Sequence, residues 1–176
     1  MTILRKFKKE WANSPVQKTI ALSMLAITFI TCFQKYILFG MNTTESLPQK
    51  IFIMVKIKPE MIRDKYYGFK YVGKSNSYYS PGAKFVKKLV GVPGDNLKAD
   101  FNDKSITLIT EKETGTTFKL LEKDSKGRIL TEQFGFNGKI PEKKYFFVGE
   151  SKNSYDSRYW GLVDEKDIIG RAYPLL

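Results

Sequence analysis

The sequence contains no histidine and only one cysteine, Cys32, and these absences exclude several common chemistries. Without histidine, a Ser-His-Asp or Cys-His peptidase is impossible, so a serine nucleophile would need a different base. A single cysteine excludes an intrachain disulfide bond and a cysteine-rich metal site. The acidic residues form no clustered loop that could bind a metal through carboxylates alone. The chain is therefore expected to use no metal and no other cofactor.

Acidic residues are also scarce relative to basic ones. There are 18 Asp and Glu against 30 Lys and Arg, which gives a formal net charge of +12. Such a balance can indicate nucleic-acid binding or attraction to an anionic membrane surface. Here the lysines are scattered, with no compact arginine patch and no nucleic-acid-binding motif. We expect no nucleic-acid partner, and a DNA-handling protein is the least favoured class.

Long apolar runs are absent except near the N terminus, where residues 19–39 are mostly apolar and Lys35 is the single charged residue. This length is close to the ~20 residues that a helix needs to cross a bilayer. Five basic residues precede the run against one acidic residue, so the N terminus is expected in the cytoplasm. A cleavable signal peptide is the alternative, but no small-x-small cleavage site lies at the boundary.

The expected organisation is therefore a single-pass plasma (inner) membrane protein in contact with the lipid bilayer. Residues 1–18 would be a cytoplasmic basic tail and residues 19–39 a transmembrane helix. Residues 40–176 would form a periplasmic or otherwise extracytoplasmic domain, with a variable insertion at 96–144 that carries no recognisable chemistry. The insertion is interpreted as structural or substrate-shaping.

Short apolar segments separated by Gly, Pro and Asn predict a mostly β domain. One or two helical turns are expected within residues 59–66. The predicted strands cover residues 51–57, 66–72, 84–92, 105–110, 116–121, 145–149 and 168–172.

Two stretches suggest a catalytic serine and a catalytic lysine. The first, Asn42 to Pro48, places Ser46 in a tight, proline-terminated turn just after the apolar run. The second, Lys84 to Asp95, places lysines on a predicted strand that ends in a Pro-Gly-Asp turn. Lysine is an established base for a serine nucleophile, in a variant of the triad arrangement.

A third stretch, Gly149 to Gly161, contains Asn-Ser-Tyr-Asp-Ser-Arg-Tyr-Trp-Gly. Together with the apolar run, the three stretches resemble the serine–lysine signal peptidases of the type I leader peptidase family. The resemblance covers roughly residues 20–60, 84–97 and 145–174. It departs from the usual Ser-Met-x-Pro pattern because Pro48 comes one residue early, and the third stretch is one residue short. The Asn-x-Thr-x-Ser-x-Pro opening and the short chain are more similar to the TraF-type peptidases of conjugative transfer.

The resemblance implies a role for each matching residue. Ser46 would be the nucleophile and Lys87, four residues before Gly91, the general base. The hydroxyl of Thr44 and the backbone N–H of Ser46 would form the oxyanion hole, although Thr44 could equally stabilise the turn. Ser154 would orient the lysine or would be an ordinary loop serine. Structural support would come from an Asp156–Arg158 ion pair and from Gly91, Pro93, Gly94 and Asp95.

Strand alternation and acid–base chemistry bear on the choice of lysine. Side chains alternate between the faces of a strand, so Lys87 points opposite to Lys88. A lysine with an ordinary pKa is only about one part in two thousand neutral at pH 7. The strand must therefore bury the ammonium group of Lys87 among apolar groups to lower its pKa. Lys88 is expected to be solvated or ion-paired.

The function implied by the resemblance is a membrane-anchored serine endopeptidase that removes the leader peptide from exported precursor proteins. The TraF-like features indicate a conjugative pilin precursor or another transfer-apparatus substrate. A housekeeping signal peptidase with many secreted substrates is one alternative. A catalytically inactive, anchored scaffold of a secretion or conjugation apparatus is another, but it would have no need of both Ser46 and Lys87.

Overall fold

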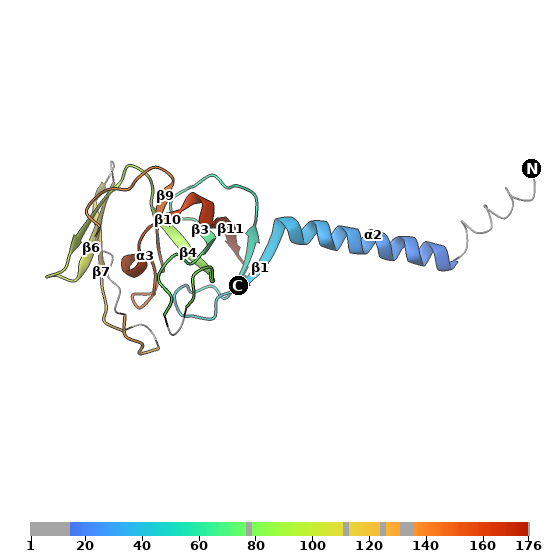
Figure 1. The fold of residues 1–176 in the computed structure, drawn as a ribbon, viewed down its shortest axis with the longest axis horizontal. Coiled ribbons are helices and arrows are strands. Elements are labelled where there is room, and N and C mark those ends of the chain that lie inside the picture. Colours follow the sequence, from blue (N-terminus) through green and yellow to red (C-terminus); the bar gives the residue numbers. More distant parts are fainter. Residues whose placement is uncertain (1–14, 77–78, 111–112, 124–125, 131–135, 176) are drawn as a thin grey trace, which may run out of the picture. The chain divides into compact units, whose positions relative to one another are not determined.

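The computed structural model describes residues 15–76, 79–110, 113–123, 126–130 and 136–175. It divides into two compact units, with the boundary between Ile37 and Leu38. The first unit contains helix α2, Pro15–Tyr36 (Figure 1). Proline is well suited to the first turn of a helix because it has no N–H to leave unpaired. Within the described residues, α2 is the one helix long and apolar enough to cross a membrane.

The bounds of α2 differ from the expected segment at 19–39. The helix starts earlier and ends at Tyr36, and the next residues form strand β1, Ile37–Met41. This strand lies at the edge of a sheet next to β2, Ile51–Val55. β-branched and aromatic side chains such as Ile37 and Phe39 favour an extended backbone when a partner strand is available.

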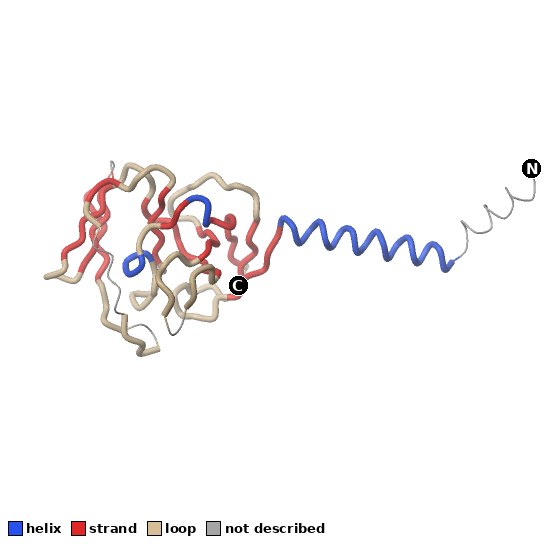
Figure 2. The backbone as a smooth tube through the Cα atoms, in the orientation of Figure 1, coloured by secondary structure: helices blue, strands red, loops and turns tan. Residues whose placement is uncertain are grey.

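The described residues of the second unit form two sheets (Figures 1 and 2). The larger has seven strands in the order β1-β2-β11-β3-β4-β9-β10. The smaller has four, in the order β7-β6-β5-β8. The further elements of the large sheet are β3 (Tyr66–Lys70), β4 (Lys84–Gly91), β9 (Lys144–Val148), β10 (Val163–Asp164) and β11 (Ile168–Pro174). Those of the small sheet are β5 (Asn96–Asp100), β6 (Ser105–Thr110), β7 (Glu113–Lys119) and β8 (Gly138–Lys139). The part of this unit that the structure describes also has two short helices, α3 (Ser157–Trp160) and the 3₁₀ helix η1 (Glu165–Asp167).

The fold class expected from the sequence is confirmed: an apolar N-terminal helix precedes a mostly β domain. Each of the seven predicted strands overlaps a strand of the structure. The helical turns expected at 59–66 are wrong, because this segment contains no helix. The hydroxyl of Tyr67 accepts the N–H of Ile62 (2.8 Å) and donates to the carbonyl of Glu60 (2.8 Å). A side chain thus binds backbone groups that a helix would pair with each other.

Residues 96–144 contribute to the main core. Leu97, Ile106 and Leu108 of the small sheet belong to the same buried cluster as Phe146 and Val148 of β9. Burying apolar surface is the dominant favourable term in folding. The smaller sheet is therefore part of the folding unit that fixes β9 and the chain that follows it.

Candidate active site

A cavity of about 310 Å³ contains both Ser46 and Lys87. Strand β1 and the turn that follows it form one side, and the first half of β4 forms another. Met54 of β2, Tyr79, Arg128 and the segment Asn153 to Tyr155 complete the lining. Residues that are far apart in the sequence thus meet around one serine and one lysine.

The turn that carries Ser46 is fixed by apolar packing on β2 and by backbone hydrogen bonds to residues 150 and 151. Leu47 is buried in a small apolar cluster with Phe52 and Met54 of β2, which fixes the turn on the sheet. The carbonyl of Ser46 accepts the backbone N–H groups of Glu150 (2.9 Å) and Ser151 (3.2 Å). The serine is itself only 5% exposed. The position of Ser46 is therefore set by the packing of Leu47 on β2 and by the hydrogen bonds to Glu150 and Ser151.

Thr44 and Ser46, the two residues expected to form the oxyanion hole, lie in direct contact. Their hydroxyl oxygens are 2.8 Å apart, and the N–H of Ser46 points to the Thr44 oxygen at 3.5 Å. The Thr44 hydroxyl donates to Oδ1 of Asn42 at 2.9 Å. Its single proton is thus held by Asn42 in this structure, and the oxyanion-hole role of Thr44 stays a prediction.

Lys87 lies on β4 opposite Tyr67 of β3, with its side chain 5% exposed. Its ammonium nitrogen is 5.8 Å from the centre of the Phe85 ring, two residues earlier on the same face. Burial lowers the pKa of Lys87 from 10.5 to about 8. The charge of Asp156 opposes this pKa shift and that of Arg158 adds to it, each to a smaller extent. The desolvation that a lysine needs in order to act as a base near neutral pH is therefore present at Lys87.

The neighbouring Lys88 faces a different environment. Its ammonium nitrogen lies 3.3 Å from a carboxylate oxygen of Asp64 and 3.8 Å from one of Glu150. Glu150 also accepts the hydroxyl of Tyr66 at 2.6 Å. Desolvation and this contact raise the pKa of Tyr66 to about 12. Lys88 is thus engaged with two carboxylates and does not line the cavity that contains Ser46.

Ser154 lines the same cavity as Lys87 and is 2% exposed. Its hydroxyl has no hydrogen-bond partner among the described residues, so no bond to Lys87 is present and the orienting role stays a prediction. Gly149 makes room for it, since a Cβ there would lie 2.1 Å from the Ser154 hydroxyl oxygen and 2.7 Å from the Ser46 carbonyl oxygen. Only glycine fits between these two residues.

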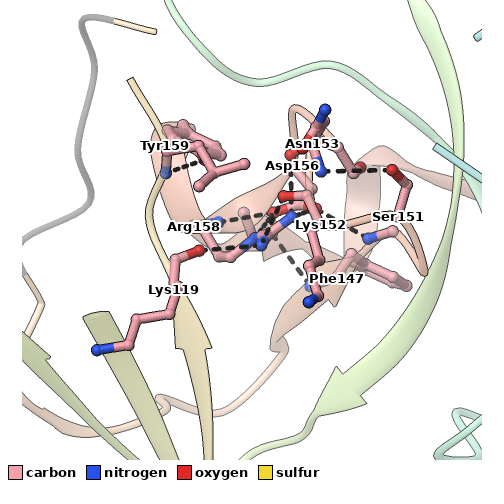
Figure 3. A network of polar contacts seen from close by, with 12 residues as sticks. Lys119, Phe147, Ser151, Lys152, Asn153, Asp156, Arg158 and Tyr159 are labelled. Atoms are coloured by element: carbon pink, nitrogen blue, oxygen red, sulfur yellow. Dashed lines mark hydrogen bonds and ion pairs between the residues drawn. The ribbon is translucent and has the colours of Figure 1, made fainter. Parts of the chain in front are cut away.

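Asp156 and Arg158 form the ion pair expected from the sequence, with Nε to Oδ1 at 2.7 Å and a second contact of 2.8 Å. Both side chains are buried. The carboxylate also accepts the N–H of Gly149 at 2.9 Å. Figure 3 shows the Arg158 guanidinium reaching the carbonyls of Lys119 (3.2 Å) and Lys152 (3.4 Å). The pair therefore ties the cavity segment to strand β7.

The Pro-Gly-Asp turn anchors the far end of β4. Asp95 is 3% exposed, forms an ion pair with Arg63 and accepts the N–H of Val92 at 2.8 Å. Gly94 has φ +92°, a conformation that favours glycine. Gly91 is packed so closely that a Cβ would lie 2.8 Å from Phe146. Together with Pro93, these residues end the strand that carries Lys87 and do not line the cavity.

Three residues that matter to this site were not singled out from the sequence. Arg63 and Arg128 lie in segments without a motif, so no signal in the sequence marks them. Asn42 opens the Asn-x-Thr-x-Ser-x-Pro pattern, but asparagine is so common in turns that the sequence assigns no role to its side chain. Within the described residues, no group of three His, Cys, Asp or Glu side chains is placed to hold a metal ion.

Comparison with known proteins gives a match to one protein family. The model of the family described as "Signal peptidase, peptidase S26" matches residues 9–176. Signal peptidase I U of Bacillus subtilis is 40% identical over 96 residues, which is 51% of this chain and 48% of the relative. Signal peptidase I V of the same organism is 31% identical over 91 residues, 48% of this chain and 53% of the relative. The chain thus spans about half the length of these two relatives. Signal peptidase I of Bacillus amyloliquefaciens is 28% identical over 168 residues, 93% of this chain and 84% of the relative.

Proposed function

The chain belongs to the signal peptidase family, peptidase S26, and from that premise we propose that it is a membrane-anchored serine endopeptidase that removes N-terminal signal peptides from exported precursor proteins. The proposal rests above all on the single cavity that contains Ser46 and a buried Lys87. With a pKa of about 8, about one-tenth of this lysine is neutral at pH 7. A neutral amine and a serine hydroxyl in one cavity can provide the base and the nucleophile for catalysis without histidine.

In the proposed reaction, neutral Lys87 takes the proton of the Ser46 hydroxyl as the oxygen attacks the scissile carbonyl carbon. The N–H of Ser46 and the hydroxyl of Thr44 stabilise the negative charge that develops on the carbonyl oxygen. The intermediate then breaks the C–N bond, and protonated Lys87 gives its proton to the leaving amine. Water, deprotonated by Lys87, finally attacks the ester on Ser46 and releases the cleaved signal peptide.

We further propose that α2, Pro15–Tyr36, anchors the enzyme in the inner membrane, with its apolar part at residues 19–36 as the transmembrane segment. Five basic residues precede this segment, which favours a cytoplasmic N terminus (residues 1–18) and an extracytoplasmic catalytic domain (residues 40–176). Ser46 would then act close to the membrane surface, where a precursor is still held by its own apolar signal peptide.

The narrower idea of a TraF-type enzyme for a conjugative pilin or transfer-apparatus substrate rests mainly on residues 42–48. The relatives described above are named signal peptidase I, which favours secreted precursors in general as substrates. We therefore propose the broader substrate class and treat a conjugative precursor as one member to be tested.

The test is to incubate the detergent-solubilised full chain with two sets of precursors, secreted proteins and pilins, and to sequence the new N termini. The Ser46→Ala variant is the matched control. We expect the wild type to cut after the signal peptide at a small residue and Ser46→Ala to leave the precursors intact. Product masses also distinguish hydrolysis from joining of the new end to another terminus, because the joined product lacks one water.

Each result has a defined meaning. Cleavage of pilin precursors alone would establish the conjugative specificity. Equal cleavage by the wild type and Ser46→Ala would refute the serine mechanism. If neither set is cleaved, the peptidase proposal fails and an inactive scaffold becomes the better account.

A further inference from the structure

The side chain of Asn42 uses both its oxygen and its nitrogen within the turn that carries the nucleophile. Its Oδ1 accepts the backbone N–H of Thr44 (3.2 Å) and the Thr44 hydroxyl (2.9 Å). Its Nδ2 donates to the carbonyls of Leu47 (3.0 Å) and Gln49 (3.2 Å). The carboxamide of Asn42 thus links the start of the turn, at Thr44, to its end, at Leu47 and Gln49.

These partners fix which end of the carboxamide points to Thr44. A backbone N–H can only donate, so the group facing Thr44 must be the oxygen. The carbonyls of Leu47 and Gln49 can only accept, so the group facing them must be the NH₂. The reverse orientation of Asn42 would place donor against donor and acceptor against acceptor.

The orientation of Asn42 in turn sets the direction of the two hydroxyl groups. Oδ1 has no proton, so the 2.9 Å contact requires the Thr44 hydroxyl to donate to it. Thr44 has only one hydroxyl proton, and the 2.8 Å contact between the two hydroxyl oxygens must therefore use the proton of Ser46. In this resting arrangement the nucleophile's proton points to Thr44 and not to Lys87.

We propose that Asn42 is a positioning residue that acts on catalysis through the Thr44 hydroxyl. It holds Thr44 as the acceptor of the Ser46 proton until a substrate is bound. The carbonyl oxygen of the substrate then takes over the Thr44 proton from Asn42, and the Ser46 hydroxyl turns its own proton to Lys87. Asn42 touches neither substrate nor the reacting atoms in this scheme. The inference rests on the peptidase function proposed above.

A double-mutant cycle between Asn42 and Thr44 tests this coupling. Thr44→Val removes the hydroxyl at nearly constant shape and should lower kcat by about 10²- to 10³-fold, as loss of an oxyanion donor does. Asn42→Ala should lower kcat by about 10- to 100-fold, the range expected when a reacting group is misplaced, with KM little changed. In the Thr44→Val background the same Asn42→Ala change should lower kcat by no more than about threefold, because the hydroxyl through which Asn42 acts is absent.

Two further measurements separate positioning from a purely structural role. The pH midpoint of kcat should be unchanged in Asn42→Ala, because the surroundings of Lys87 are untouched. Asn42→Asp, closest in shape, is run through the same cycle in case Asn42→Ala fails to fold, and its kcat loss should also shrink in the Thr44→Val background. Glu45→Ala, an exposed neighbour in the same turn, is the matched control and should leave kcat unchanged.

Equal losses from the Asn42 changes in both backgrounds would overturn the proposal and leave Asn42 as a loop-closing residue. A shifted pH midpoint in Asn42→Ala would also overturn it, because the residue would then act through the lysine. Failure of the peptidase function gives a different result, since processing by the wild type would then be absent or would survive Ser46→Ala.

Discussion

Lys87 and Lys88 are adjacent on strand β4, yet their ammonium groups lie in opposite environments. Lys87 is 5% exposed and shares a cavity with Ser46, and its pKa is lowered to about 8. The side chain of Lys88 is 29% exposed and lies between the carboxylates of Asp64 and Glu150. Alternation along a strand produces this separation, because successive side chains point to opposite faces of the sheet. One lysine thus has a lowered pKa in the cavity of Ser46, and the other is ion-paired outside it.

The first prediction concerns these two lysines and the serine. Ser46→Ala and Lys87→Ala should each abolish precursor processing, with a loss of at least about 10³-fold, since nucleophile and base act as one unit. Lys88→Ala should keep most of the activity because its side chain leaves the strand on the other face. Processing is measured by the shift of the precursor on a gel, and circular dichroism checks that each variant folds. An inactive Lys88→Ala with an active Lys87→Ala would show that the base is misassigned.

The second prediction is the pH dependence of the reaction. The base must be neutral Lys87, so kcat should rise with pH along a single ionisation near the pKa of about 8. The rate should therefore increase about tenfold for each pH unit below the midpoint and level off above it. A profile that is flat from pH 5 to 9 would contradict a lysine base.

The third prediction is that the catalytic lysine lowers the stability of the folded protein. Its pKa is about 8 when folded, against 10.5 for an ordinary lysine. Below pH 8 both states carry the proton, and the folded state bears the full cost of a buried charge, roughly 3 kcal/mol. Above pH 8 the folded state releases the proton first, so the cost declines as the pH rises towards 10.5.

Lys87→Met keeps the length of the side chain without the charge. It should be inactive and more stable than the wild type at pH 7, by up to roughly 3 kcal/mol. The difference should narrow by about 2 kcal/mol between pH 8 and 9.5. Urea unfolding of both proteins across this pH range measures the difference in their free energies of unfolding. A difference that grows with rising pH would refute the assigned pKa shift.

Much of the fold could be predicted from the sequence because its signals are local. Apolar runs such as Tyr145 to Gly149 are bounded by turn residues, and each run became a strand. Lys87 could be separated from Lys88 because the side-chain period of a strand is fixed at two. The end of α2 was misplaced because Ile37 to Phe39 are apolar enough for a membrane helix but pair with β2 instead.

Other features depend on contacts between distant segments, which a sequence does not display. Arg63 and Asp95 form an ion pair although they are 32 residues apart in the sequence, and no sequence pattern near either residue predicts this contact. Arg128 reaches the cavity from a segment without a motif and donates to the hydroxyl of Tyr79 at 3.1 Å. The hydrogen bonds of Asn42 likewise require the three-dimensional path of the turn.

The fourth prediction concerns the buried ion pair of Asp156 and Arg158. Arg158→Met should lower the free energy of unfolding by about 3–5 kcal/mol, because it leaves a carboxylate buried without its partner. Adding Asp156→Asn to Arg158→Met should lower the free energy of unfolding much less than Asp156→Asn does in the wild type. The reason is that the second change removes a carboxylate that has already lost its partner. The exposed pair of Lys119 and Asp103 provides the control, and its removal should change stability little. Additive losses at Asp156 and Arg158 in thermal unfolding would show that the two side chains act independently.

The last prediction is the orientation in the membrane, because the proposed reaction needs Ser46 on the side where signal peptides emerge. Five basic residues precede the apolar segment, and Ser46 lies seven residues beyond Phe39. A basic flank is retained in the cytoplasm, so the domain after residue 40 should be outside. Protease added to intact spheroplasts that express the chain should digest this domain and spare an N-terminal tag placed before residue 1. If the domain resisted digestion until the spheroplasts were lysed, Ser46 would lie in the cytoplasm, and a signal peptidase function would be ruled out.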